Sequence, residues 1–273
     1  GSRGHVVTLP AGVAALAAQL PTLQLWSKFK PSARQLRWVL DPRPAAMFGG
    51  AAYGGKSVGQ LMAALMYVDQ PHYRALIVRS TLAELKESGA LIDMAHEWLD
   101  DTAASWSEID KTWTFPNGAK IVFGYLADQN VKRYLGSQWH FIGIDECTEV
   151  HPDAASELRT RLRRNEGDPI PLRFRVSTNP GGTWHSWWKK RYVDRGLLVR
   201  SFMEDNPAGG AAEYRVSLKE ATTASRFAQL ADGDWDSTAH AGASWDPSDI
   251  IYVEEPDPSR IMRYVVGVDT SAS

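Results

Sequence analysis

Residues 50–57, with the sequence GAAYGGKS, constrain the possible folds of this chain more than any other stretch. They fit a pattern in which a glycine is followed, after four residues, by Gly-Lys-Ser. Glycines let successive backbone N–H groups turn inward around phosphate oxygens, and a following helix points its positive end at the anion. In such a loop Lys56 would neutralise the β- and γ-phosphates, and Ser57 would give its hydroxyl to Mg²⁺. The residues predicted to contact the nucleotide are Gly50, Ala51, Ala52, Tyr53, Gly54, Gly55, Lys56 and Ser57.

The patterns on both sides of this glycine loop (residues 50–57) favour phosphate binding over a plain structural turn, which is the alternative explanation. A short apolar strand is predicted at residues 45–48, immediately before the loop. Apolar residues then recur three or four positions apart from Val58 to Met66, as they do on the buried face of a helix. A strand, a glycine loop and a helix in this order are the context that the phosphate-binding motif requires.

A second motif, FIGIDE, places two acids directly after an apolar run. Asp145 is expected to hold Mg²⁺ through water, and Glu146 to polarise the attacking water. An acid pair in this position is otherwise typical of a helix N-terminus, where carboxylates interact favourably with the helix dipole. Because phosphoryl transfer depends mainly on positioning and charge neutralisation, Lys56, Ser57, Asp145 and Glu146 together predict ATP hydrolysis with ATP and Mg²⁺ as cofactors.

Strands and helical stretches alternate along most of the chain, which predicts a mainly parallel α/β sheet. Residues 9–40 are expected to form one or two helices, broken at Pro21 and Pro31. Residues 112–126 are predicted to form a β-hairpin. The sequence ELRTRLRR, residues 157–164, is predicted to be a basic helix.

Composition adds weaker constraints. The formal net charge of −2 means that contact with nucleic acid would depend on a local basic patch. Cys147 is the one cysteine, which excludes an internal disulfide and favours an intracellular setting. No apolar run reaches the length of about 18 residues that a membrane span needs.

Several ordered segments together resemble one known family. FGGAAYGGKS, ALIVRSTLAEL, FPNGAKIVFGYL, RYLGSQWHFIGIDE and STNPGG occur in the order found in the ATPase domain of large terminase subunits of tailed bacteriophages. These proteins are motors that pump DNA into preformed capsids. The resemblance implies a P-loop NTPase of the ASCE/RecA-like type, with helices flanking a mainly parallel sheet.

The resemblance also implies a division of the chain. Residues 1–44 would be a helical lead-in and residues 45–255 the ATPase core with its C-terminal subdomain. Residues 256–273 would be a linker and the first strand of an RNase H-like nuclease domain, in which Asp269 matches the first metal-binding acid. Since two-metal cleavage needs several convergent acids, no nuclease activity is expected from this chain.

Further roles follow from the resemblance alone. Gln35 lies where an adenine-contacting glutamine is expected, and Asn179 lies in the segment that couples hydrolysis to movement; a plain Asn-Pro turn is the alternative for Asn179. Ala52 and Tyr53 stand where many relatives carry a basic residue. Relatives receive an arginine finger from a neighbouring subunit, and the candidates here are Arg133, Arg161 and Arg163.

A packaging motor must also hold duplex DNA by its phosphates. The candidate contacts, which could instead be solvated surface charges, are Arg163, Arg164, Lys189, Lys190 and Arg191. The resemblance implies a homo-oligomeric ring, a pentamer, although an isolated chain could be monomeric. It also implies a portal protein and a small terminase subunit as partners, double-stranded DNA as cargo, and the host cell cytoplasm as the location. A RecA-type helicase or another nucleic-acid-dependent ATPase is the main alternative, and a nucleotide-gated module without turnover is a second.

Overall fold

The computed structural model describes residues 16–87, 89–126, 131–206 and 209–237, and Asp269 lies outside them. Within these residues an eight-stranded sheet has the order β3-β4-β5-β2-β6-β7-β1-β8. The strands are β1 (Ala45–Gly50), β2 (Arg74–Arg79), β3 (Ser105–Ser107), β4 (Thr112–Thr114), β5 (Lys120–Tyr125), β6 (Phe141–Asp145), β7 (Arg173–Thr178) and β8 (Leu198–Ser201). Pairing is parallel from β5 to β8, whereas β3 and β4 pair antiparallel at one edge. The predicted α/β class and hairpin are confirmed.

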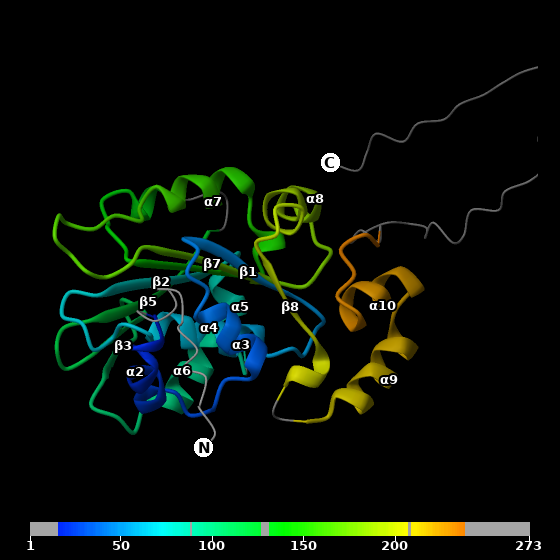
Figure 1. Cartoon of the computed structure of the whole chain (residues 1–273), viewed down its shortest axis with the longest axis horizontal. Coiled ribbons are helices and arrows are strands. Elements are labelled where there is room, and N and C mark those ends of the chain that lie inside the picture. Colours follow the sequence, from blue (N-terminus) through cyan, green and yellow to red (C-terminus); the bar gives the residue numbers. More distant parts are fainter. Residues whose placement is uncertain (1–15, 88, 127–130, 207–208, 238–273) are drawn as a thin grey trace, which may run out of the picture.

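Helices cover both faces of the sheet (Figure 1). Those on one face are α2 (Leu20–Trp26), α3 (Ala33–Val39), α4 (Lys56–Leu65), α5 (Leu82–Lys86) and α6 (Leu91–Leu99). Those on the other are α7 (Pro152–Arg159) and α8 (His185–Trp188), which continues into the π-helix η4 (Lys189–Val193). The short 3₁₀ helices are η2 (Val131–Tyr134), η3 (Cys147–Glu149) and η5 (Met203–Asp205). The remaining helices, α9 (Ala211–Ala221) and α10 (Ala224–Ala231), lie beside the sheet, next to the end of β8.

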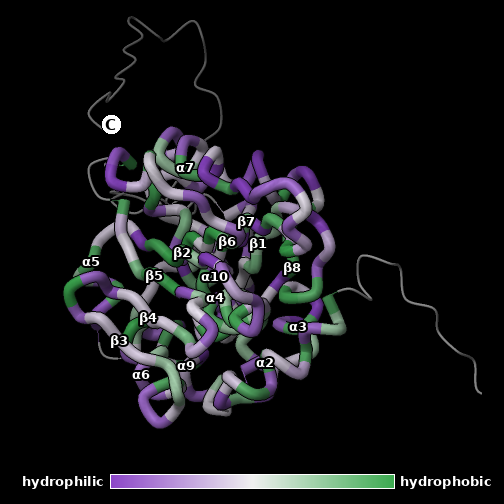
Figure 2. Tube along the Cα trace, turned by 90° about the vertical axis from the view of Figure 1, so that its left-hand side faces the viewer, coloured by the Kyte–Doolittle hydropathy of each residue, from purple (hydrophilic) through white to green (hydrophobic). Residues whose placement is uncertain are grey.

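The two-residue period of the strands divides the apolar residues between two cores. In β1, Ala46 and Phe48 belong to the core under α3 and α4, whereas Ala45 and Met47 belong to the core under α7 and α8. Both faces of the central strands are thus buried, as in doubly covered parallel sheets. Figure 2 shows hydrophobic positions gathered in the middle of the molecule and hydrophilic ones along the outer turns. Among the described residues, no helix is long and apolar enough to cross a membrane.

Two expected helices differ from the structure. Pro21 lies in the first turn of α2, where proline is tolerated because its missing N–H has no partner to lose there, so this proline does not break a helix. The basic helix predicted for residues 157–164 is wrong, since α7 ends at Arg159. Beyond it the chain turns and forms a parallel bridge between Leu162 and Trp139, with Trp139 N donating to the Arg161 carbonyl at 3.0 Å. This bridge holds the backbone in an extended conformation, so the helix cannot continue through these residues.

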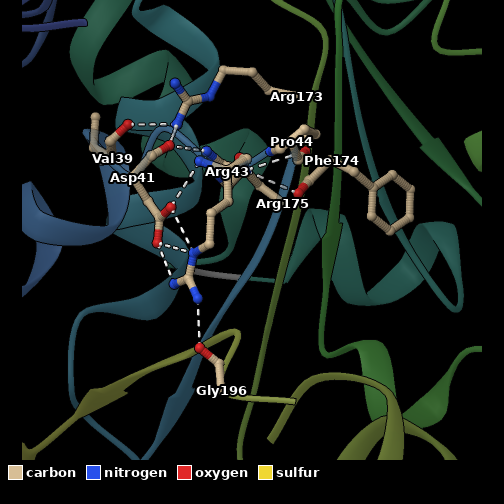
Figure 3. A network of polar contacts seen from close by, with 8 residues as sticks. All are labelled: Val39, Asp41, Arg43, Pro44, Arg173, Phe174, Arg175 and Gly196. Atoms are coloured by element: carbon tan, nitrogen blue, oxygen red, sulfur yellow. Dashed lines mark hydrogen bonds and ion pairs between the residues drawn. The ribbon is translucent and has the colours of Figure 1, made fainter. Parts of the chain in front are cut away.

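Three arginines fix the connection that leads from α3 into β1 (Figure 3). Arg43 pairs with the carboxylate of Asp41, donating through Nε at 2.9 Å. From β7, Arg173 and Arg175 each donate through Nη2 to the Asp41 carbonyl, at 2.6 and 2.7 Å. Because β1 continues into the glycine loop, this network holds the strand from which the loop starts.

Candidate functional site

Three neighbouring parallel strands, β6, β7 and β1, end at the same edge of the sheet. The glycine loop follows β1, Asp145 is the last residue of β6, and β7 lies between these two strands. The Ser57 hydroxyl, at the start of α4, donates to Asp145 Oδ2 at 3.1 Å. The two motifs that are far apart in the sequence therefore meet through their side chains.

The glycine loop needs its first and sixth residues to be glycine. Gly50 and Gly55 have φ angles of 146° and 68°, which side chains rarely adopt. A Cβ at Gly50 would lie 2.3 Å from the Ser201 carbonyl, and one at Gly55 would lie 2.6 Å from Gln35 Nε2. Gly55 is followed at once by α4, so the N-terminus of that helix opens into the loop.

Lys56 is buried inside the loop, and its Nζ donates to the Ala51 carbonyl at 2.6 Å. Burial lowers the pKa of Lys56, while the charges of Glu146 and Asp145 act against that change. An ammonium held in this way is ready to exchange a backbone carbonyl for a phosphate oxygen, which is a stronger, charge-assisted partner.

Glu146 occupies a left-handed backbone conformation, with φ 51° and ψ 49°, between β6 and η3. Its Oε2 accepts from Thr178 Oγ1 at 3.3 Å, and this hydroxyl is 2.8 Å from that of Thr148. Burial and the neighbouring Asp145 raise the pKa of Glu146, although Lys56 and Arg79 oppose this rise. A carboxyl group with a raised pKa is a suitable acceptor for a proton from water.

These residues fit a magnesium nucleotide. Gly54 and Gly55 add no side chain to a loop whose backbone N–H groups would contact phosphate, and Lys56 supplies a cation. A hydroxyl and a carboxylate, from Ser57 and Asp145, are the hard oxygen donors that Mg²⁺ prefers.

Sequence analysis overlooked three side chains at this edge. Arg79, the last residue of β2, donates to Asp145 Oδ2 through Nε at 2.9 Å and Nη2 at 2.6 Å. Ser177 donates to the other carboxylate oxygen at 2.7 Å, and Thr178 contacts Glu146. Each of the three is the last or second-last residue of a strand that pairs with β6. Polar residues at the C-terminal ends of predicted strands were therefore the sequence feature that could have indicated them.

Gln35 lies next to the glycine loop, but both ends of its amide are bonded within the protein. Its Nε2 donates to the Gly55 carbonyl at 2.8 Å, and its Oε1 accepts from Ser32 N at 2.8 Å in the capping box of α3. Asn179 follows β7 directly after Thr178, and its Oδ1 is buried without a hydrogen-bond partner among the described residues. Both residues are therefore at the site edge, and their roles stay predictions.

The candidate basic residues lie on η2, in the segment after α7 and on η4. Arg133 is exposed on η2, with its guanidinium 4.5 Å from the centre of the Tyr125 ring. Arg161 donates to the Leu135 carbonyl at 2.9 Å. The contacts of the remaining candidates are Arg163 to the Ser137 carbonyl, Arg164 to the Ile170 carbonyl, Lys189 to Asp236 and Arg191 over the Trp187 ring, whereas Lys190 is exposed.

Solved structures share this fold at low sequence identity. The large terminase of a thermophilic bacteriophage, in a complex with ATP-gamma-S, matches with a TM-score of 0.60 and 16% identity, covering 76% of this chain and 53% of that one. The large terminase of bacteriophage HK97 matches with 0.56 and 13%, covering 79% and 55%. The large terminase ATPase domain of Thermus phage P74-26 matches with 0.53 and 13%, covering 77% and 96%.

The chain thus spans about half the length of the first two of these terminases and most of the isolated ATPase domain. No curated protein matches it. The structural likenesses identify the fold as that of a P-loop NTPase. The family model described as "Terminase large subunit, T4likevirus-type, N-terminal" matches residues 47–250, which include the glycine loop and the acid pair. The chain therefore belongs to the large terminase family, of which it carries the N-terminal part.

Proposed function

We propose that this chain is the ATP-hydrolysing motor domain of a viral large terminase subunit, which moves double-stranded DNA into a procapsid. The observation that carries the proposal is the meeting of Lys56, Ser57, Asp145 and Glu146 at one edge of the sheet. Structural neighbours include the thermophilic bacteriophage terminase in complex with ADP and, separately, with ATP-gamma-S, which supports ATP as the ligand.

Each residue has a chemical role in this proposal. The loop N–H groups and Lys56 bind and orient the phosphates, and Ser57 and Asp145 would hold Mg²⁺, which would supply neutralising charge to the phosphates. Glu146 accepts the proton of the water whose oxygen attacks the γ-phosphorus, so that ADP and phosphate are released. Asn179, which directly follows β7, lies in the segment that couples hydrolysis to movement in this proposal.

Membership of the large terminase family supports a proposal for the division of the chain and for its partners. We assign residues 45–255 to the ATPase core with its C-terminal subdomain, and residues 256–273 to a linker and the first strand of an RNase H-like nuclease domain. The partners would be a portal protein, a small terminase subunit and identical subunits in a ring in the host cytoplasm.

Of the finger candidates, Arg133 fits best because it is exposed and has no ion pair with another described residue, whereas Arg161 is bonded to a carbonyl. DNA would contact the basic residues near α7 and η4.

Turnover tests this proposal most directly. Glu146→Gln removes the proton acceptor and should lower ATP hydrolysis, measured with DNA present, by about 10²–10⁴-fold. Glu149→Gln is the matched control, because that acid lies on η3 nearby and is exposed. Equal loss in both variants, or full activity in Glu146→Gln, would contradict the role of Glu146.

A helicase is the alternative function, and a forked DNA substrate distinguishes it from a packaging motor. The proposed motor acts on duplex DNA and should not separate the strands, even when ATP is consumed. ATP-dependent unwinding by the wild-type chain that is lost in Glu146→Gln would favour the helicase instead.

A further inference from the structure

Donors from three other elements, α4, β2 and β7, surround the carboxylate of Asp145. Oδ2 accepts from Ser57 Oγ at 3.1 Å and from Arg79 Nε and Nη2 at 2.9 and 2.6 Å. Oδ1 accepts from Ser177 Oγ at 2.7 Å. The Asp145 side chain is 1% exposed and that of Arg79 is 13% exposed. This is a buried ion pair and not a surface contact.

In this arrangement Arg79 occupies the Asp145 oxygen that lies beside Ser57, where Mg²⁺ would be held between the two side chains. A hydrated Mg²⁺ ion needs a carboxylate oxygen that can accept from its water shell. The oxygen nearest Ser57 is Oδ2, which is already shared with both Arg79 nitrogens. The other oxygen faces Ser177 on β7. Mg²⁺ can therefore use Asp145 together with Ser57 only after Arg79 has withdrawn.

The buried Asp145 carboxylate needs a positive charge beside it, either Arg79 or Mg²⁺. A buried carboxylate without a partner is strongly destabilising. When no metal is present, Arg79 supplies the compensating charge. Its Nη1 also donates to the Glu84 carbonyl at 3.1 Å, near the end of β2. Arg79 therefore keeps a hydrogen-bond partner on that side when it leaves Asp145.

We propose that Arg79 and Mg²⁺ are alternative partners of Asp145, so that the arginine closes the metal site when it is empty and leaves when the magnesium nucleotide enters. This inference rests on the proposed function and extends it, because it assigns a control of metal entry to a residue outside both motifs. Arg79 acts in it as a positioning residue.

The Mg²⁺ dependence of ADP affinity, measured by calorimetry, tests this exchange. A competing internal partner lowers apparent affinity in proportion to the fraction of protein that is competent to bind. Arg79→Gln should therefore reduce the Mg²⁺ concentration that gives half-maximal ADP affinity. If the state with Arg79 on Asp145 is about ten times more populated than the state without this contact, the reduction should be about tenfold. Without Mg²⁺ the variant should melt at a lower temperature than the parent. Added Mg²⁺ should raise the melting temperature of the variant by more than it raises that of the parent.

Arg74→Gln is the matched control. Arg74 begins the same strand that Arg79 ends, and its Nη1 donates to the carbonyls of Tyr73 and Gly118 at 3.1 and 2.8 Å. This substitution should leave the Mg²⁺ requirement unchanged even if it lowers stability.

A second measurement uses the folded parent chain. The ¹⁵N resonance of Arg79 Nε, assigned by its absence from Arg79→Lys, should shift and exchange faster with water when Mg²⁺ and ADP are both added. An unchanged resonance at saturating Mg²⁺ and ADP, or an equal Mg²⁺ requirement in parent and Arg79→Gln, would overturn this inference alone. Failure of the parent to bind ADP at any Mg²⁺ concentration would instead contradict the proposed function.

Discussion

At the scale of single residues, two of the four non-glycine residues that have a positive φ in the described part of the chain lie in the glycine loop and the acid pair. Tyr53 and Glu146 have φ angles of 61° and 51° although neither is glycine. Such conformations cost about 1–3 kcal/mol and persist where the surroundings hold them. Tyr53 is held by a hydrogen bond from Asn206 Nδ2 to its carbonyl at 2.9 Å, and Glu146 by its position between β6 and η3.

Gly55→Ala should show how tightly the loop is built. The alanine would need a φ angle of 68°, and its Cβ would lie 2.6 Å from Gln35 Nε2. We expect a loss of about 1–3 kcal/mol in the free energy of unfolding, measured by denaturant titration. Gly196→Ala is the control, since Gly196 has a φ of 67° with no atom within 4 Å of the added Cβ. Equal losses in both would show that the contact with Gln35 contributes nothing.

At the scale of elements, the connection between α3 and β1 depends on the ionisation of Asp41. Burial raises the pKa of Asp41, but the hydrogen bonds and charge of Arg43 outweigh this and lower it below its ordinary value. The unfolded chain therefore binds more protons in this range, and the stabilisation present above about pH 4 is lost as the pH falls through the folded pKa.

Thermal unfolding between neutral and acidic pH tests this connection. Asp41→Asn should remove the acid-dependent component, and Arg43→Gln should weaken the same component because the two side chains act as a pair. If the unfolding temperature of Asp41→Asn depends on pH as steeply as that of the parent, the ion pair does not stabilise this connection.

The helices α9 and α10 are joined to the glycine loop and should respond to what it binds. The Leu230 carbonyl accepts from Ala52 N at 2.7 Å, and the rings of Tyr53 and Tyr214 are 5.2 Å apart. Binding of nucleotide should slow hydrogen exchange across residues 211–231, and Tyr53→Ala should reduce this effect. Phe29→Ala is the control, because Phe29 has a similar exposure of 44% and packs on Trp98 instead. Equal protection in parent and Tyr53→Ala would show that the helices are not coupled through Tyr53.

At the scale of the whole molecule, sequence patterns predicted what depends on local order along the chain. Apolar strands alternating with helices indicated the α/β class, and the residues of the glycine loop and of the FIGIDE motif indicated the candidate site. What depends on strand order was not predictable. Arg79 ends an ordinary apolar strand, and its contact with Asp145 exists because β2 pairs with β6. Similarly, α7 ends at Arg159 because the next residues bridge to Trp139, far away in sequence.

The central claim, that the glycine loop binds a magnesium nucleotide, is tested most directly by calorimetry with Mg²⁺ and a slowly hydrolysed ATP analogue. The parent chain should bind saturably, and Lys56→Ala should weaken binding by about 10–100-fold, as expected for the loss of a charge-assisted hydrogen bond. Lys86→Ala, at an exposed lysine paired with Glu108, should bind like the parent. Absence of binding by the parent, or equal affinity in Lys56→Ala, would contradict this account of the site.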